Sequence, residues 1–148
     1  MAGYPQLNLD HQLCFALYKA SRAMTRAYAP LLERAGLTYP QYLTMLALWQ
    51  DTHQPRSVGE LGERLHLDSG TLTPLLKRLV SMGYVTRSRD AGDERRVLVT
   101  LTAEGLALRD QLAAVPGSIL SCLGMDLPDT ITLRERLNAL TESLEASA

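Results

Sequence analysis

The 148-residue sequence is poor in cysteine and in aromatic residues: it has two cysteines, Cys14 and Cys122, one phenylalanine and one tryptophan. Two cysteines are too few for a disulfide-stabilised scaffold, which favours free thiols in a reducing compartment. No apolar run approaches the roughly 18 residues of a membrane span, and the N-terminus lacks the charged and apolar segments of a signal peptide. We therefore expect a cytoplasmic protein with no membrane partner.

The chain also lacks an overall positive charge, because its formal net charge is −1. Its basic residues are nevertheless segregated: residues 69–100 contain six basic and three acidic residues, a local net charge of +3, whereas residues 101–148 contain three basic and seven acidic ones. Apolar residues make up 46% of the sequence, enough to bury a core. We expect one domain over residues 1–148, with a basic segment of the kind that binds nucleic acid.

Helical periodicity covers both ends of the chain. Asp10 is the expected N-cap of a long first helix, and Asp129 is the expected N-cap of an amphipathic C-terminal helix. Another helix is expected to begin with Pro40 in its first turn. The buried side of this helix is expected to consist of Leu43, Leu46 and Trp49.

Residues 57–83 predict two short helices joined by a tight turn. Ser57 and Glu60 have the spacing of a capping box that opens the first helix, and Asp68 is the expected N-cap of the second. Gly83 is expected to end the second helix. The apolar stripe of this second helix consists of Leu72, Leu75, Leu76 and Leu79.

The period changes to two after Gly83, which predicts a β-hairpin with strands at 85–89 and 97–101, called the wing below. Its tip, residues 90–94, contains Asp and Gly residues that tolerate turn geometry. Helix, turn, helix and charged hairpin is the order of a winged helix-turn-helix, whose second helix enters the major groove of DNA. The predicted fold class is therefore mainly α with a small β-hairpin wing.

Polar residues of the second short helix lie opposite its leucine stripe. Small hydroxyls and glycine allow a helix to approach base edges, while Lys and Arg reach phosphates or guanine. An arginine at a hairpin tip can enter a narrow minor groove, and Arg95, with Asp93 placed to pair with it, is the expected one. The alternative is a solvated basic face on an ordinary helix pair. The expected DNA-binding residues are Ser69, Gly70, Thr71, Thr73, Lys77, Arg78, Arg89, Arg95 and Arg96.

Four stretches of the sequence, residues 12–28, 36–49, 58–79 and 93–105, resemble the MarR family, and within it the OhrR-type organic hydroperoxide sensors. They include QLCFALYKASRAMTRAY and DERRVLVTLTAEG. The resemblance implies a homodimer held together by N- and C-terminal helices, here about residues 9–36 and 103–148. It implies a winged helix-turn-helix over about 40–102, with a recognition helix from Ser69 to Arg78 and a wing arginine at Arg95.

Cys14 lies near the start of the first predicted helix, where the helix dipole modestly favours an anion. A peroxide-sensing cysteine must react as the thiolate, although a lone cysteine can also be a small buried apolar residue. In OhrR-type proteins, the matching cysteine senses peroxide and is hydrogen-bonded by two tyrosines, which correspond here to Tyr28 and Tyr39. Cys14 and Tyr28 are 14 residues apart, or about 21 Å along one helix. Unless the helix breaks, we therefore expect Tyr28 to come from a partner subunit.

Cys122 lies in the region where the resemblance places a resolving cysteine of the partner subunit. Some family members close a disulfide with such a residue, whereas others use one cysteine and an external thiol. Both mechanisms remain open for this chain.

These features predict a repressor that binds a pseudo-palindromic operator in double-stranded DNA when reduced, and releases it when an organic hydroperoxide oxidises Cys14. One alternative is a MarR-type repressor released by a phenolic or other small-molecule ligand. The other is a thiol peroxidase. Since the sequence shows no metal cluster and no nucleophile triad, we expect no enzymatic activity, no metal and no cofactor.

Overall fold

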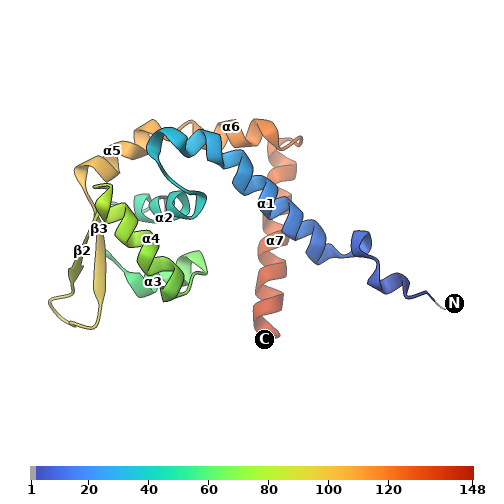
Figure 1. Ribbon diagram of the computed structural model, residues 1–148, viewed down its shortest axis with the longest axis horizontal. Coiled ribbons are helices and arrows are strands. Elements are labelled where there is room, and N and C mark those ends of the chain that lie inside the picture. Colours follow the sequence, from blue (N-terminus) through green and yellow to red (C-terminus); the bar gives the residue numbers. More distant parts are fainter. Residues whose placement is uncertain (1–2) are drawn as a thin grey trace. The chain divides into compact units, whose positions relative to one another are not determined.

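The computed structural model describes residues 3–148 and divides into two compact units, one extending to Ala113 and one comprising Ala114–Ala148. The first unit contains an antiparallel three-stranded sheet and most of the helices (Figure 1). Its α-helices are α1 (Leu13–Leu32), α2 (Tyr39–Trp49), α3 (Val58–Leu65), α4 (Ser69–Ser81) and α5 (Ala103–Gln111). Its other elements are the 3₁₀ helices η1 (Pro5–Leu7), η2 (Leu9–His11) and η3 (Glu33–Ala35) and the strands β1 (Arg56–Ser57), β2 (Val85–Arg89) and β3 (Val97–Leu101). The predicted fold class is confirmed.

Helix α1 begins later than the sequence suggested, and the prediction that Asp10 is its N-cap is wrong. Asp10 lies in η2, where its backbone N–H donates to Asn8 Oδ1 at 2.9 Å. The N-cap of α1 is Gln12, whose side chain makes no capping hydrogen bond. Asn8 and Asp10 both have cap-forming side chains, so the local pattern did not separate a 3₁₀ turn from the helix start. Cys14 is consequently the second residue of α1, which continues unbroken to Leu32.

The predicted buried side of α2 is also wrong. Leu46 is 37% exposed, and Leu43 and Trp49 are only partly buried. The helix sequence YPQYLTMLALW is apolar on more than one side, so its periodicity did not select a face, and packing within the unit does so. The buried residues of α2 are Gln41, Tyr42, Thr44, Met45 and Leu48.

Helices α3 and α4 form the predicted pair, and both predicted caps are confirmed. Ser57 Oγ accepts from the Glu60 N–H at 3.1 Å, and Asp68 Oδ1 accepts from the Thr71 N–H at 2.7 Å. The turn between the helices is tight because His66 adopts the left-handed conformation, with φ 53°. The leucine stripe of α4 is buried as predicted: Leu72, Leu75, Leu76 and Leu79.

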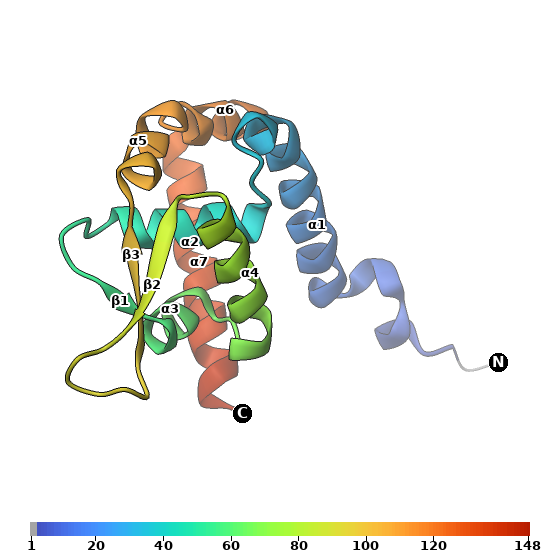
Figure 2. The same cartoon turned by 60° about the vertical axis from the view of Figure 1, so that its left-hand side comes forward.

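The wing consists of β2 and β3, with Arg87 opposite Val99 in the antiparallel register. Strand β1 pairs with the other edge of β3, where Ser57 lies opposite Leu98, so the sheet order is β1-β3-β2. The sequence did not predict β1, because a two-residue strand has no periodicity to detect. Figure 2 shows the hairpin extending beyond the ends of α3 and α4.

The second unit contains α6 (Val115–Cys122) and α7 (Leu127–Ala146). The prediction that Asp129 caps the last helix is wrong: Asp126 is the N-cap, and its Oδ1 accepts from the Asp129 N–H at 2.8 Å. Pro128 lies in the first turn, where a helix tolerates proline, so the helix begins before the predicted point. None of the helices within residues 3–148 has both the length and the apolar character needed to span a bilayer.

Candidate DNA-binding surface and cysteine site

The outer side of α4 carries the polar residues that the sequence singled out. Thr73 is partly buried, and Pro74 beside it is exposed. Pro74 was missed by the sequence reasoning, although it lies inside the helix and has no N–H for the carbonyl of Gly70 four residues earlier. The small side chains at the start of the helix leave its backbone accessible. The exposed predicted residues of α4 are Ser69, Gly70, Thr71, Lys77 and Arg78.

At the wing, the predicted pairing of Asp93 with Arg95 is confirmed. Asp93 Oδ1 accepts from the backbone N–H of Arg95 at 3.1 Å and from its Nε at 3.3 Å. The Arg95 side chain is otherwise 92% exposed. The carboxylate therefore holds the near end of the guanidinium and leaves its outer edge available to a ligand.

Arg89 and Arg96 are engaged within the protein itself. Arg89 Nη1 donates to the carbonyl oxygen of Glu94 at 2.8 Å. Arg96 lies between two carboxylates, 3.1 Å from Asp90 and 3.5 Å from Glu60. Both arginines stabilise the wing, and their contact with DNA stays a prediction.

A cavity of about 560 Å³ is lined by residues of α3, α4 and the wing. Arg87, which the sequence reasoning did not select, lines it, and its buried Nε has no hydrogen-bond partner among residues 3–148. No sequence signal distinguished Arg87 from the other wing arginines, because its partial burial depends on how the helices pack against the sheet. The remaining charged and hydroxyl residues around the cavity are Ser57, Glu60, Glu63, Thr73, Arg95 and Arg96.

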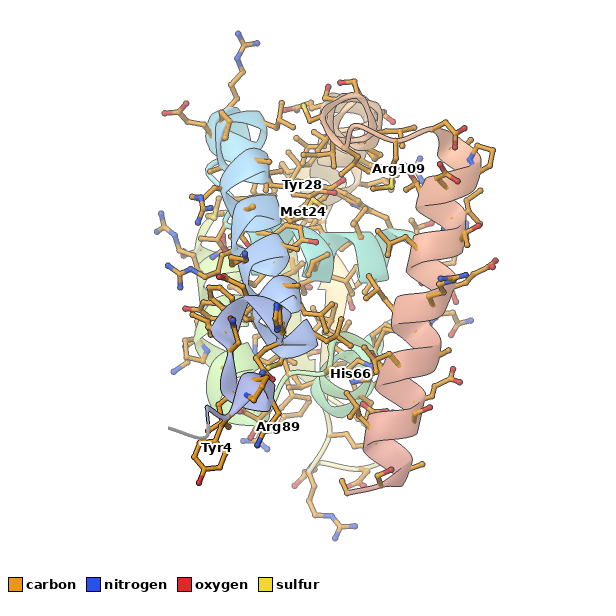
Figure 3. The ribbon with its side chains drawn as sticks, turned by 90° about the vertical axis from the view of Figure 1, so that its right-hand side faces the viewer. Tyr4, Met24, Tyr28, His66, Arg89 and Arg109 are labelled. Carbon is orange, nitrogen blue, oxygen red and sulfur yellow. The ribbon has the colours of Figure 1, made fainter. Side chains whose placement is uncertain are left out.

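The structure brings Tyr28 and Tyr39 together, with ring centroids 4.5 Å apart, and Tyr28 lies on the same side of α1 as Met24 (Figure 3). It does not bring them to Cys14 of the same chain. Because α1 is unbroken, the 14 residues between Cys14 and Tyr28 correspond to about 21 Å. Cys14 is exposed, so its thiol is open to a partner or a small oxidant.

Tyr42 and Trp49 extend the tyrosine pair into the interior. The Tyr42 ring lies 5.6 Å from that of Tyr28 and 6.5 Å from that of Trp49, whose Nε1 donates to the Gly105 carbonyl of α5 at 2.9 Å. Sequence reasoning missed Tyr42, which is 1% exposed. This cluster fixes the tyrosine pair against the base of α5.

The tyrosines are held in their protonated form. Burial, together with the neighbouring Tyr39 and Tyr42, raises the pKa of Tyr28 to about 12, and burial has the largest effect. Burial also raises the pKa of Tyr39. Because both groups ionise above the ordinary value of about 10, both remain O–H donors at neutral pH. A pair of phenolic donors suits an anionic acceptor such as a thiolate.

Cys122 is the last residue of α6 and is exposed. Its Sγ donates to the Ser118 carbonyl at 3.3 Å. Both cysteines are free thiols. Within the described chain, no group of three or more His, Cys, Asp or Glu residues is arranged to hold a metal ion.

Comparisons with known proteins bear on both the DNA-binding surface and the cysteine site. Residues 26–112 match the family described as "Transcriptional regulator SarA/Rot". Over 95% of both chains, the sequence is 45% identical to the "Organic hydroperoxide resistance transcriptional regulator" of Bacillus subtilis (strain 168). The chain is a MarR-family transcriptional regulator. Within that family it belongs with the organic hydroperoxide resistance regulators, which confirms the resemblance seen in the sequence.

Two solved structures of one protein, AbfR, are also similar to this MarR-family regulator. Reduced AbfR bound to DNA is 35% identical, with a TM-score of 0.82 over 95% of both chains. Disulfide-formed AbfR is 39% identical, with a TM-score of 0.63 over 92% of this chain and 94% of that one.

Proposed function

We propose that this regulator is a redox-sensing repressor that binds a pseudo-palindromic operator when reduced and releases it when an organic hydroperoxide oxidises Cys14. One observation carries the proposal: the exposed thiol of Cys14 lies about 21 Å along the unbroken helix α1 from Tyr28, whose ring contacts that of Tyr39 at the start of α2. Neither the Cys14 thiol nor the tyrosine pair is expected to sense peroxide efficiently alone. Two copies of the chain supply both halves.

The proposed assembly is a homodimer formed by the N- and C-terminal helices, about residues 9–36 and 103–148. Helix α7 supports it, because none of its residues is buried in the single chain. Several exposed apolar side chains on one helix indicate an interface with another protein chain. The exposed apolar residues of α7 are Leu127, Ile131, Leu133, Leu137 and Leu144. In this dimer, Tyr28 and Tyr39 of one subunit donate hydrogen bonds to the Cys14 thiolate of the other.

The proposed DNA interface joins α4 to the wing. Helix α4 enters the major groove through its exposed hydroxyl, glycine and basic residues, and Arg95 enters the adjacent minor groove. In a symmetric dimer, the two recognition helices then occupy major grooves roughly 34–36 Å apart. Reduced AbfR, which shares this fold, is bound to DNA in its solved structure.

The proposed chemistry takes two steps. The Cys14 thiolate attacks an oxygen of the hydroperoxide, the O–O bond breaks, and an alcohol leaves after taking up a proton, so that Cys14 becomes a sulfenic acid. The thiol of Cys122 from the partner subunit then attacks that sulfur, an S–S bond forms, and water leaves. AbfR has a solved form with a disulfide. The disulfide favours a dimer whose two heads no longer match the operator spacing.

Wild-type binding to an operator selected from a random DNA library tests this function against its rivals. We expect cumene hydroperoxide to raise the Kd about 100-fold, or about 2.7 kcal/mol, and dithiothreitol to restore it. A phenolic compound without oxidant is expected to change the Kd less than about twofold. Release by the phenolic compound alone would instead support a ligand-responsive repressor. Many turnovers of peroxide per chain with a dithiol would support a thiol peroxidase, whereas we propose that the protein is not an enzyme.

A further inference from the structure

The two carboxylate oxygens of Glu60, the third residue of α3, contact different partners. Oε2 accepts from the Ser57 backbone N–H at 2.8 Å and so completes the cap of α3. Oε1 lies 3.5 Å from Nη2 of Arg96, which is 36 positions later in the chain. One carboxylate thus connects the start of α3 to the turn of the wing, at the residue before β3.

Arg96 is itself fixed within the wing. Its Nη1 lies 3.1 Å from Asp90 Oδ2, and its carbonyl oxygen accepts from the Asp90 N–H at 2.9 Å. Its own N–H donates to the Asp93 carbonyl oxygen at 2.9 Å. Asp93 in turn holds Arg95. A shift of Arg96 relative to α3 therefore moves the residues that position Arg95.

We propose that Glu60 is a positioning residue for DNA recognition. By holding Arg96, it fixes the angle at which the wing stands against α3, and thereby the point that Arg95 reaches on the duplex. The inference rests on the proposed DNA-binding function. It assigns the wing arginines different tasks: Arg95 contacts DNA, whereas Arg96 connects the wing to α3.

The sign of the expected effect separates positioning from simple electrostatics. A carboxylate beside the DNA surface repels phosphates, so loss of its charge alone strengthens binding. Loss of a positioning contact weakens binding instead. The Arg96 and Glu60 side chains are 46% and 49% exposed, so the effect of their pairing is modest.

The test is Glu60→Gln in the reduced protein, measured on the operator selected by the wild type. Glutamine at this position preserves the capping box, so the Tm is expected to stay within about 2 °C of wild type. We expect operator affinity to fall about fivefold for each wing, which corresponds to about 1 kcal/mol. Hydroxyl-radical footprinting is expected to lose protection in the outer minor grooves and keep it in the central major grooves.

Glu63→Gln is the matched control. Glu63 lines the same cavity one turn later on α3, and no ion pair of its side chain occurs within residues 3–148. Removing its charge is expected to leave operator binding unchanged or to strengthen it. Arg95→Ala provides the second comparison. This variant lacks the guanidinium that Glu60 is proposed to position. In the Arg95→Ala background, Glu60→Gln is therefore expected to change operator affinity less than about twofold.

Failure of the positioning role of Glu60 gives a different result from failure of the proposed DNA-binding function. If the wild-type protein selects no DNA site, the proposed function fails. If it binds its operator but Glu60→Gln binds as tightly as wild type or more tightly, as expected for Glu63→Gln, positioning by Glu60 is overturned. An undiminished effect of Glu60→Gln in the Arg95→Ala background would overturn it as well.

Discussion

Replacing Cys14 by serine is expected to leave operator binding by the reduced protein unchanged and to abolish its release by organic hydroperoxide. Serine has nearly the same size as cysteine, and Cys14 is exposed in the chain, so the fold is expected to be unaffected. Serine does not form a sulfenic acid or a disulfide. Fluorescence anisotropy with labelled operator is expected to show a change in Kd below about twofold on oxidation, against about 100-fold for wild type.

Cys122→Ser is the companion variant, because it retains the sensing thiol and removes the proposed resolving one. We expect Cys14 to be oxidised at the wild-type rate in this variant, with no intersubunit disulfide on a non-reducing gel. Release is then expected only when an external thiol is added. If Cys14→Ser still releases the operator on oxidation, Cys14 is not the sensor.

Among the substitutions described, Gly105→Ala is expected to lower the free energy of unfolding most. A Cβ at Gly105 would overlap the carbonyl oxygen of Tyr84 and lie 2.9 Å from its carbonyl carbon, with Leu101 Cδ2 at 3.3 Å. The Tyr84 oxygen also accepts from the Thr102 N–H at 3.1 Å, and the Gly105 oxygen accepts from Trp49. Because the obstacle is backbone, α5 must move away from Tyr84, the residue before β2. We expect a loss of about 3 kcal/mol in the free energy of unfolding, measured by urea denaturation.

Gly117→Ala is the control for this substitution. Gly117 lies within α6, and nothing would stand within 4 Å of an added Cβ. Alanine is the better helix former, so stability is expected to stay the same or rise by up to about 1 kcal/mol. Equal stability of Gly105→Ala and wild type would contradict the close approach of α5 to Tyr84.

The features predicted correctly from sequence are mostly local. The caps at Ser57 and Asp68 depend on residues three positions away, and the pairing of Asp93 with Arg95 spans two positions. Such contacts follow from the chain's own geometry. Asp10 and Asp129 show the limit of local patterns. Asp126 caps α7 in place of Asp129, whereas α1 begins after Gln12 with no side-chain cap, and Asn8 near Asp10 caps η2 instead.

The features that sequence reasoning missed depend on distant parts of the chain. Trp49 and Gly105 are 56 positions apart, and Glu60 and Arg96 are 36 positions apart. No periodicity or spacing encodes such pairs. The roles of Tyr28 and Tyr39 came from family resemblance, whereas their stacking and their raised pKa values required the packed structure. The helix length alone, however, already separated Tyr28 from Cys14 of its own chain.

Mixed dimers test most directly whether the redox site is shared between two subunits. One chain carries Cys14→Ser, and the other carries Tyr28→Phe and Tyr39→Phe; the mixed species is isolated through two different affinity tags. If the site is shared, the remaining Cys14 faces the intact tyrosines of the partner chain. If the site lies within one chain, no complete site remains.

The measured quantity is the rate at which Cys14 is oxidised by substoichiometric cumene hydroperoxide, followed by mass spectrometry of the trapped sulfenic acid. Loss of a hydrogen bond to a charged group costs about 1.5–3 kcal/mol, so the homodimer lacking both tyrosines is expected to react at least about tenfold more slowly than wild type. The mixed dimer is expected to react at the wild-type rate per thiol. Reaction of the mixed dimer at the slow rate would contradict a shared site.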